Sequence, residues 1–451
     1  MKYRHRSYCN IIVGMAMVFL FIACDEEYDT VFEERPDERL QSRLDEYQQL
    51  LVNAPHGWLA GLKTGTGRSY FYYFNFNLDG TVVMVSDFDE TTAGTPGTGT
   101  WTLKALQRAT LSFDTYSYIH LPADPDGDIN GGIDGEGLIS DFEFAFDELA
   151  GDSIKLQGIQ RSSGLYLLPA TEEEASQILG KQILNVIAGT KQLNTNHRGL
   201  QVELPDGQLL PVVLDDKLRI FGAQYLTENG ARVEMFHSYF TFSAEGIVLK
   251  KPLNIAGSTI EQLLWDDENQ LFTVEMNGVR AVEGYTEPFI LPVDPPLHTR
   301  LGEEYPGITI PSGSGMSPIQ GQSQEFMEAY NFAANSMLEG EYALTLRDII
   351  LLFDTKEEIM EFRVVISQGG SLFLAQYLYD YTLDDQGIFK FTFQQASQNG
   401  WAIYGDMYPI LFHFETDTFK AEFIGGELNL VGGLFSQQNA GYYFSGFLSN
   451  Q

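Results

Sequence analysis

The feature that most constrains the fold of this chain is a pair of alternating, aromatic-rich strands joined by a tight turn. The pair reads Ser69-Tyr-Phe-Tyr-Tyr-Phe-Asn-Phe-Asn77, then Leu-Asp79-Gly80, then Thr-Val-Val-Met-Val85. Asp-Gly between two such runs is typical of a β-hairpin, because both residues tolerate the positive φ angles that the turn needs. The pattern therefore predicts an antiparallel sheet built from hairpins.

The same order of aromatic strand, turn and glycine occurs twice more, at Gly246 and Gly387. The glycines are 166 and 141 residues apart (246 minus 80, and 387 minus 246), which is too long for the repeat of a solenoid or a propeller. We therefore predict a β-rich α+β protein of antiparallel β-meander modules, sandwich or open barrel, each preceded by a helix. Duplication of one module and convergence of hairpin chemistry both explain the likeness.

Helices are predicted from apolar spacing and from capping residues. An apolar stripe at spacings of four, three and four predicts a helix over residues 37–53: Leu40, Leu44, Tyr47 and Leu51. Thr171 and Glu174 form a capping box, which predicts the start of a second helix that ends near Gly189. A third helix is predicted around Phe326 to Met337.

These elements divide the chain into six parts. Residues 291–322 hold six of the 17 prolines and a Ser-Gly-Ser-Gly run, which is the composition of a linker. The predicted parts are a signal peptide (1–23), an acidic tether (24–36), a helix plus β-meander domain (37–170), a second helix plus β module (171–290), the linker (291–322) and a C-terminal helix plus β domain (323–451).

The N-terminus has the pattern of a signal peptide. Three basic residues precede an apolar run from Ile11 to Ala23 that ends at Cys24. These 13 residues rise only about 20 Å as a helix, less than a bilayer core requires. The run Phe21-Ile-Ala-Cys24 resembles the lipobox of bacterial lipoproteins, with Phe21 where Leu is usual. The other cysteine, Cys9, lies in the segment to be removed, so we expect no disulfide and a lipid on Cys24. The alternative is an ordinary signal peptide with an accidental cysteine.

An acidic run follows Cys24 and resembles the surface-export signal of Bacteroidetes lipoproteins. Its members are Asp25, Glu26, Glu27, Asp29, Glu33, Glu34, Asp37 and Glu38. We therefore expect a protein that the lipid on Cys24 anchors in the outer membrane, facing the cell exterior.

Charge excludes one class of partner. The chain has 27 Lys plus Arg against 62 Asp plus Glu, a net charge of -35, and removal of the three basic signal residues would leave 24 minus 62, or -38. Nucleic-acid binding proteins neutralise phosphates with clustered basic residues, so we expect no nucleic-acid partner.

The order of these features resembles a known family, the Bacteroidetes lipoproteins grouped as domain of unknown function 4302. The resemblance rests on the lipobox and tether and on four later motifs: Glu38-Arg39-Leu40, Ala54-Pro55-His56-Gly57-Trp58, Asp79-Gly80 and Leu111-Ser-Phe-Asp-Thr-Tyr116. It covers the first 170 residues best. It implies genes near outer-membrane nutrient importers and near metallopeptidases, with no established activity, and it assigns no catalytic residue.

One loop has the spacing of a calcium site. Counted from Asp126, carboxylates and an amide stand at the first, third, fifth and ninth positions: Asp126, Asp128, Asn130 and Asp134. Gly137 occupies the twelfth position, where the bidentate Glu of such loops belongs, and Glu136 is one place early. Two alternatives follow: the loop binds calcium, or it is a solvated loop that is simply rich in Asp and Gly. No other cofactor is expected.

No standard catalytic motif is present in the sequence. It contains neither G-x-S-x-G nor H-E-x-x-H, and six histidines stand apart: His56, His120, His197, His237, His298 and His413. We therefore expect no enzyme activity. Paired carboxylates of a hydrolase remain an alternative, because 62 acidic residues allow many such pairs.

Aromatic rows are the best candidates for a binding surface. Tyr377, Tyr379 and Tyr381 alternate along one strand and so lie on one face, as do Tyr70 to Phe76 in the first hairpin. The mixed first row is typical of a core, whereas the all-tyrosine row is the predicted exposed platform for sugar rings or another protein. The alternative for both rows is sheet core.

The sequence therefore predicts a non-catalytic ligand-binding or accessory subunit of an outer-membrane nutrient uptake system. Its ligand would be a glycan or a peptide, and its partners the membrane, through Cys24, and importer components. A surface hydrolase with paired carboxylates and a structural envelope protein are the alternatives.

Overall fold

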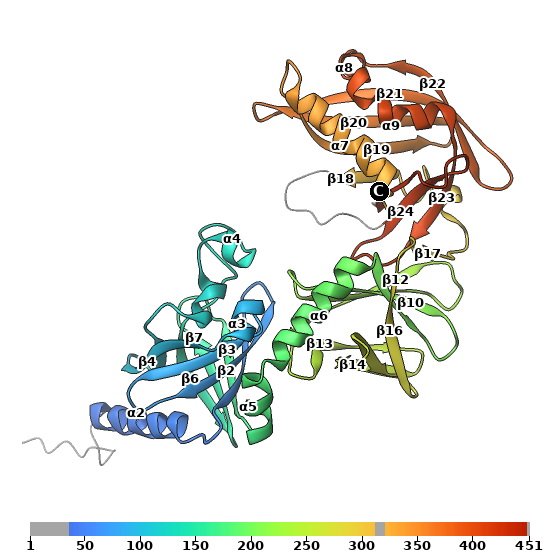
Figure 1. Ribbon diagram of the computed structural model, residues 1–451. Helices are drawn as coiled ribbons and strands as arrows, with labels where there is room; N and C mark the ends of the chain where they lie inside the picture. The colour runs from blue at the N-terminus through green and yellow to red at the C-terminus, as the bar shows by residue number, and fades with distance from the viewer. Residues whose placement is uncertain (1–35, 312–320, 449–451) are drawn as a thin grey trace, which may run out of the picture.

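The computed structural model describes residues 36–311 and 321–448, which form three β-rich modules (Figure 1). The predicted signal peptide, Cys24 and all but the last residue of the acidic tether lie outside these residues. All sheets are antiparallel, which confirms the β-rich α+β class. None of the helices in 36–311 and 321–448 has the length and apolarity to cross a membrane.

Module 1 is a closed eight-stranded barrel, because β1 pairs with both β2 and β8. Its elements are α2 (Pro36–Val52), β1 (Trp58–Lys63), β2 (Ser69–Phe76), β3 (Thr81–Ser86), α3 (Glu90–Gly94), β4 (Gly97–Ala105), β5 (Ala109–Phe113), η1 (Tyr118–Ala123), α4 (Gly127–Asn130), β6 (Glu143–Ala150), β7 (Ser153–Gly158) and β8 (Gly164–Pro169).

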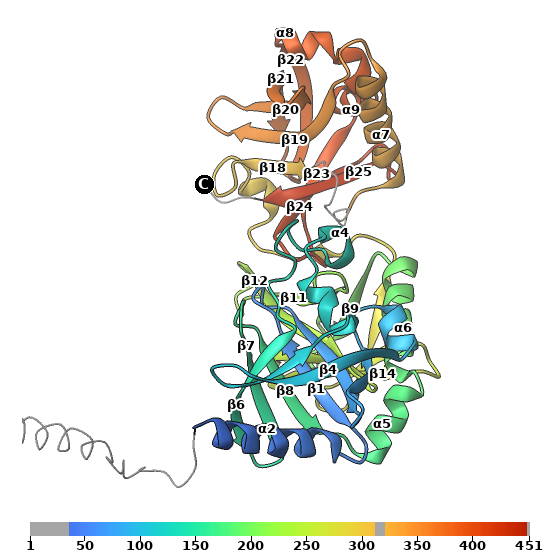
Figure 2. The same cartoon turned by 90° about the vertical axis from the view of Figure 1, so that its left-hand side faces the viewer.

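The predicted first hairpin and first helix are confirmed in this module. β2 and β3 pair around the Asp79-Gly80 turn, where Gly80 has a φ of 82°. Helix α2 lies across one end of the barrel (Figure 2), and its ring of Tyr47 stacks on Phe146 with centroids 3.9 Å apart. The predicted mixed row of β2 is core, because Tyr72 and Phe74 are fully buried.

Module 2 is a second closed eight-stranded barrel, because β9 pairs with both β10 and β16. Its elements are α5 (Glu172–Leu179), α6 (Gln182–Asn196), β9 (Gly199–Glu203), β10 (Leu209–Asp215), β11 (Ile220–Leu226), β12 (Val233–Phe242), β13 (Gly246–Ile255), β14 (Ser258–Asp266), β15 (Leu271–Glu275) and β16 (Val279–Tyr285).

The predicted capping box at Thr171 is present, but the predicted end of its helix is wrong. Thr171 and Glu174 exchange the expected hydrogen bonds. The helix breaks at Lys181, whose φ is +69°, and resumes as α6 through Asn196. Gly189 lies inside α6, where the ring of Trp265 packs against it. A Cβ at this position would be 2.2 Å from that ring, which explains why the residue is glycine. The glycine thus marks a close approach and not a helix end.

Module 3 is a nine-stranded sheet in which the β23–β24 pairing closes β18 to β25 into a ring, with β17 beside β23. Its elements are β17 (Ile290–Leu291), η2 (Leu297–Thr299), β18 (Gly307–Pro311), α7 (Gln324–Glu339), β19 (Thr345–Asp354), β20 (Ile359–Gln368), β21 (Ser371–Leu383), β22 (Ile388–Ala396), α8 (Gln398–Ala402), α9 (Tyr404–Thr416), β23 (Thr418–Ile424), β24 (Val431–Ser436) and β25 (Tyr443–Leu448).

The predicted linker over 291–322 is wrong for its first part. β17 and β18 belong to the sheet of module 3, and Leu297 and Leu301 between them are buried in its core. The prolines of this segment therefore shape connections within a folded module. For the same reason module 3 opens with strands, and its helix α7 follows them.

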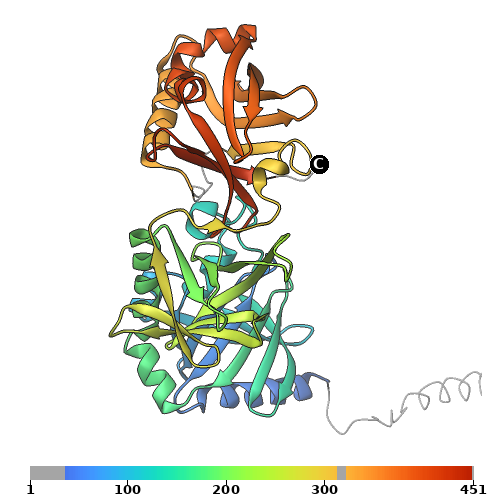
Figure 3. The ribbon, with the colours of Figure 1, turned by 90° about the vertical axis from the view of Figure 1, so that its right-hand side faces the viewer.

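The modules are arranged as two barrels with module 3 at one end (Figures 2 and 3). Helix α6 lies between the barrels, and its Ile183 shares a core with Tyr73 and Val85 of module 1. The core of barrel 2 thus extends across the boundary, so the two barrels pack as one unit.

A buried ion pair joins the barrels. The Arg219 guanidinium lies 2.9 Å from the Asp87 carboxylate, and the two side chains are 3% and 0% exposed. The Asp87 carboxylate also accepts hydrogen bonds from the backbone amides of Phe71 and Phe242, one from each barrel. The guanidinium lies 5.2 Å from the ring of Tyr70 and 4.5 Å from that of Phe242.

A buried amide joins module 2 to module 3. The Gln224 side chain is 1% exposed, donates to the carbonyl of Asn429 and accepts from the amide of Gly426. Leu226 and Val233 of module 2 pack against the core of module 3. All three modules therefore share buried contacts with a neighbour.

We predict that Arg219→Met lowers the free energy of unfolding by about 3–5 kcal/mol, because it leaves the buried carboxylate of Asp87 unpaired. Denaturant titration followed by tryptophan fluorescence measures the loss. The control is Lys191→Met, which breaks the exposed ion pair with Glu90 and should cost at most about 1 kcal/mol. Equal losses in the two variants would contradict the role given to the buried pair.

Candidate functional site

The predicted tyrosine platform on β21 is wrong. Tyr377 and Tyr379 are fully buried and Tyr381 is 8% exposed, because α8 and α9 cover that face of the sheet. The hydroxyl of Tyr377 donates to the carbonyl of Gly400 in α8, and the ring of Tyr379 packs edge-on to Phe393. Burial raises the pKa of Tyr377 and Tyr379. The row is a core row and presents no surface to a ligand.

The predicted calcium loop is held by its own hydrogen bonds. Asp126 caps α4 and accepts from the amide of Asp128, while Asp134 accepts from the amide of Gly127. Asn130 is buried and donates to two backbone carbonyls. Within the described part of the chain, no three His, Cys, Asp or Glu side chains are grouped to hold a metal. The loop thus lacks the converging carboxylates expected of it, and calcium binding there stays a prediction.

A row of exposed aromatic side chains in module 3 lies instead on α8 and α9. We call it the aromatic ridge and define it by four residues: Trp401, Tyr404, Tyr408 and Phe412. Trp401, Tyr408 and Phe412 are 56%, 45% and 42% exposed, and Tyr404 is half-buried between them. Large aromatic side chains in a continuous exposed row mark interaction sites more often than scattered ones do.

The rings of the ridge contact one another in sequence. Their centroids are 5.5 Å apart from Trp401 to Tyr404, 6.0 Å from Tyr404 to Tyr408 and 5.9 Å from Tyr408 to Phe412. Phe393 of β22 lies 5.9 Å from Trp401 and extends the row toward the sheet. The ridge is therefore a supported surface in which each ring limits the rotation of the next.

Helix geometry places these side chains on one side of α9. Residues four apart lie on one face of a helix, which aligns Tyr404, Tyr408 and Phe412. The face toward the sheet carries buried apolar residues: Met407, Ile410, Leu411 and Phe414. Because burial of that face fixes the helix, the aromatic row is left toward solvent.

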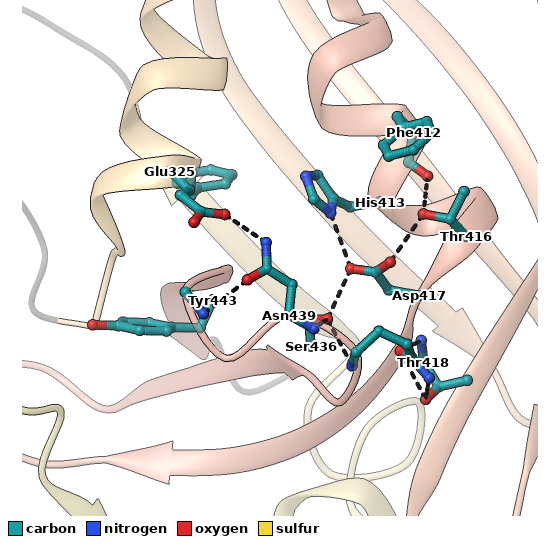
Figure 4. A network of polar contacts seen from close by, with 12 residues as sticks. Glu325, Phe412, His413, Thr416, Asp417, Thr418, Ser436, Asn439 and Tyr443 are labelled. Atoms are coloured by element: carbon teal, nitrogen blue, oxygen red, sulfur yellow. Dashed lines mark hydrogen bonds and ion pairs between the residues drawn. The ribbon is translucent and has the colours of Figure 1, made fainter.

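A polar network fixes the C-terminal end of α9 (Figure 4). The Asp417 carboxylate lies 2.9 Å from Nδ1 of His413 and accepts from the hydroxyls of Ser436, at 2.8 Å, and Thr416, at 2.9 Å. The His413 ring stacks on the buried ring of Tyr442, with centroids 3.6 Å apart. The network therefore ties α9 to the turn after β24.

The network is not a catalytic triad. In a Ser-His-Asp triad the serine contacts the histidine, which takes up its proton. Here the hydroxyl of Ser436 donates to Asp417, and both Ser436 and Asp417 are buried. The group has the geometry of a structural anchor.

The neighbouring helix α7 is attached to the same turn. Ser323 caps α7 by accepting from the amide of Phe326, and its hydroxyl also accepts from the amide of Tyr443. Asn439 donates to the carboxylate of Glu325 at 2.5 Å (Figure 4). The N-terminus of α7 and the C-terminus of α9 are thus attached to one polar turn, which fixes the support of the ridge.

The titratable groups of the site are held in defined protonation states. Burial raises the pKa of Tyr404 to about 12, helped by its hydrogen bond to Glu415. Burial alone would raise the pKa of Asp417, but hydrogen bonds from His413, Ser436 and Thr416 outweigh it and lower that pKa below 3.8. At neutral pH the Tyr404 hydroxyl is therefore a donor, and Asp417 is a carboxylate.

The ridge was not predicted from the sequence, although a signal for it was present. Spacings of three, four and four from Trp401 to Phe412 fit one helix face. Gly405 and Pro409 interrupt that pattern with residues that disfavour helix interiors, and most of the intervening residues are apolar. The period alone could not distinguish the buried face from the exposed one.

A family profile matches the chain over residues 28–267, and its description is Domain of unknown function (DUF4302). The matched region contains all of module 1 and most of module 2. No curated protein matches the chain.

Two solved structures align with most of the chain at low similarity. One is a DnaN sliding clamp, DNA polymerase III subunit beta, from Pseudomonas aeruginosa bound to griselimycin: 10% identity, 91% of this chain, 98% of that chain and a TM-score of 0.16. The other is a DNA polymerase sliding clamp from Caulobacter crescentus: 9% identity, 92% of this chain, 98% of that chain and a TM-score of 0.12. TM-scores this low do not establish a shared fold.

We predict that Asp417→Asn lowers the free energy of unfolding by about 1.5–3 kcal/mol at pH 7, because hydrogen bonds to an ionised group are lost. The folded pKa lies below the unfolded one, so the carboxylate stabilises the fold above about pH 4 and loses this effect as the pH falls through the folded pKa. Denaturant titrations between pH 7 and pH 3 should show the difference from wild type shrinking. The control is Asp385→Asn on the exposed β21–β22 turn. A constant difference across this range would contradict the assignment.

Proposed function

The chain belongs to the family described as Domain of unknown function (DUF4302), and we propose that it acts as a cell-surface lipoprotein that binds a ligand without catalysis. In this proposal it is a ligand-binding or accessory subunit of an outer-membrane nutrient uptake system, with a glycan or a peptide as ligand. The observation that carries the proposal is the aromatic ridge on α8 and α9.

The ridge offers what an extended ligand needs for binding. Aromatic rings bury large areas, and tyrosine and tryptophan keep a polar tip in contact with water. From Tyr404 to Phe412 the ridge rises about 12 Å along α9, which is the length of about four residues of an extended peptide. Contacts between neighbouring rings restrict side-chain rotation before binding, so less of that entropy remains to be lost.

Both ligand classes fit chemically. The apolar face of a sugar ring stacks on an aromatic ring, while the Tyr404 hydroxyl and the Glu415 carboxylate, 3.0 Å apart, offer partners for sugar hydroxyls. Apolar side chains of a peptide pack on the same rings, because aromatic residues dominate the binding energy of protein interfaces. Binding to a glycan array or to a peptide array would distinguish the two ligand classes.

The position of the ridge supports display at a surface. Cys24 is 12 residues before Pro36, the first residue of α2 (36 minus 24). Helix α2 and helix α8 lie at opposite ends of the molecule (Figure 1). A lipid on Cys24 would hold the α2 end at the membrane, with the ridge directed away from it.

The ridge is tested by a triple variant, Trp401→Ala/Tyr408→Ala/Phe412→Ala. We expect wild-type protein to bind members of a glycan or a peptide array, and the variant to bind them more than tenfold more weakly, because three exposed rings are lost. All three side chains are 42% or more exposed, so the variant should still fold, and its circular dichroism spectrum and unfolding midpoint verify this.

The matched control is Phe332→Ala/Tyr342→Ala, which removes two rings of module 3 outside the ridge that are 56% and 58% exposed. It should bind as wild type does. Empty arrays with wild-type protein, or an equal loss in the control, would refute the ridge as the binding surface.

The surface location is tested by Cys24→Ala and by protease treatment of intact cells. We expect the wild type to be cleaved on whole cells and the variant to leave the membrane fraction, because the lipid would be its attachment. A control periplasmic protein must stay intact. Protection of the wild type until the outer membrane is broken would favour a structural envelope role over ligand capture.

A further inference from the structure

A hollow lies at one end of barrel 2, where the chain passes into module 3. It has a volume of about 1530 Å³. Its walls are the turns of the β9–β10, β11–β12 and β13–β14 hairpins together with residues 289–292, which include β17. Barrel mouths and domain junctions are where ligand sites occur most often, and this hollow is both.

The floor of this hollow is aliphatic. Six of its apolar residues are Leu204, Leu209, Leu210, Leu226, Ile255 and Leu291, and only Tyr225 and Phe289 are aromatic. Leu209 is 48% exposed and Ile290 is 40% exposed, so part of this apolar surface faces water. An aliphatic floor suits aliphatic side chains better than sugar rings, which stack on aromatic faces.

The rim is polar and carries more negative than positive charge. Asp206 and Glu228 face the hollow with one cation, Arg232, and neutral amides such as Asn254 complete the rim. The whole chain carries a net charge of -35. Anionic ligands, including acyl chains that end in a carboxylate, are therefore disfavoured relative to neutral or basic ones.

Strand β17 adds an open backbone edge. It pairs with β23 through Ile290 and Leu291, and the carbonyl of Phe289 accepts from the amide of Gly425. Because hydrogen bonding alternates along an antiparallel strand, the amide and carbonyl of Ile290 point away from β23. An extended peptide can pair with such an edge and place alternate side chains in a pocket beside it.

Hydrogen bonds between module 2 and module 3 hold the walls of the hollow. Gln224 in its wall is the buried amide that joins module 2 to module 3. Arg300 of module 3 donates to the carbonyl of Ala231 at 2.6 Å, and the amide of Asp294 donates to the carbonyl of Gly230. These bonds fix the β11–β12 turn against module 3.

We propose that the hollow binds an extended peptide segment with aliphatic side chains and neutral or basic ends. The site is separate from the aromatic ridge and does not depend on the function proposed for it. A bound segment would lie along β17 with its aliphatic side chains on the leucine floor and its polar ends at the amide-rich rim.

The probe is a heptapeptide of alternating leucine and serine, to which one lysine is added. Its ends are acetylated and amidated, and it carries a rhodamine label. Fluorescence anisotropy with the purified full chain, at physiological salt, should show saturable binding. Leu209→Glu and Ile290→Glu should each weaken it tenfold or more, because each replaces an exposed apolar contact with a charge. Leu209 and Ile290 are 48% and 40% exposed, so the fold should tolerate both changes. An unchanged circular dichroism spectrum and unfolding midpoint would confirm folding.

Four controls, two protein variants and two altered probes, separate this site from the ridge and from non-specific binding. Leu168→Glu, at a 40% exposed leucine of module 1, and the triple ridge variant should both bind the probe as wild type does. A probe with serine in place of every leucine should not bind, and one with glutamate in place of lysine should bind more weakly.

Four results would overturn the proposal. They are no saturable binding, equal binding of the all-serine probe, loss of binding in the ridge variant but not in Leu209→Glu, and displacement of the probe by decanoate at a lower concentration than by unlabelled peptide. The last would assign the hollow to acyl chains.

Discussion

The arrangement of this molecule depends on one buried ion pair, Arg219 with Asp87. Each charge would be costly in a dry interior by itself, and the two meet only when the barrels are docked. The carboxylate accepts hydrogen bonds from backbone amides of β2 and β12, and the guanidinium lies between aromatic rings of both barrels. Any other docking of the barrels would leave these buried groups unpaired, so the pair disfavours other orientations.

That orientation fixes what lies farther along the chain. Helix α6 shares its core with both barrels, and Gln224 and Arg300 carry the connection into module 3 without a free linker. The ridge and the hollow therefore occupy constant positions relative to α2. If the N-terminal end of the protein were held at a membrane, the contacts between modules would give the ridge and the hollow a defined orientation relative to that membrane.

Local features were predictable and packing choices were not. The Asp79-Gly80 hairpin and the Thr171–Glu174 box follow from interactions within a few residues, which the sequence displays directly. The tyrosine row of β21 needed a fact that no strand pattern contains: α8 and α9 return over that face after β22. In the same way Gly189 reads as a helix end, although its reason is the ring of Trp265, 76 residues later (265 minus 189).

The ridge is the reverse case, aromatic residues in a helix that could have been core and are not. Met407, Ile410, Leu411 and Phe414 occupy the face of α9 toward the sheet, so no apolar surface remains to cover Trp401, Tyr408 and Phe412. Asp417 and Ser436 then fix the end of the helix, which prevents a rotation that would bury the row. Exposed rings in a row are costly in water, because apolar area is left hydrated. A structure that fixes them outward so firmly is one in which that area is available for burial by a ligand.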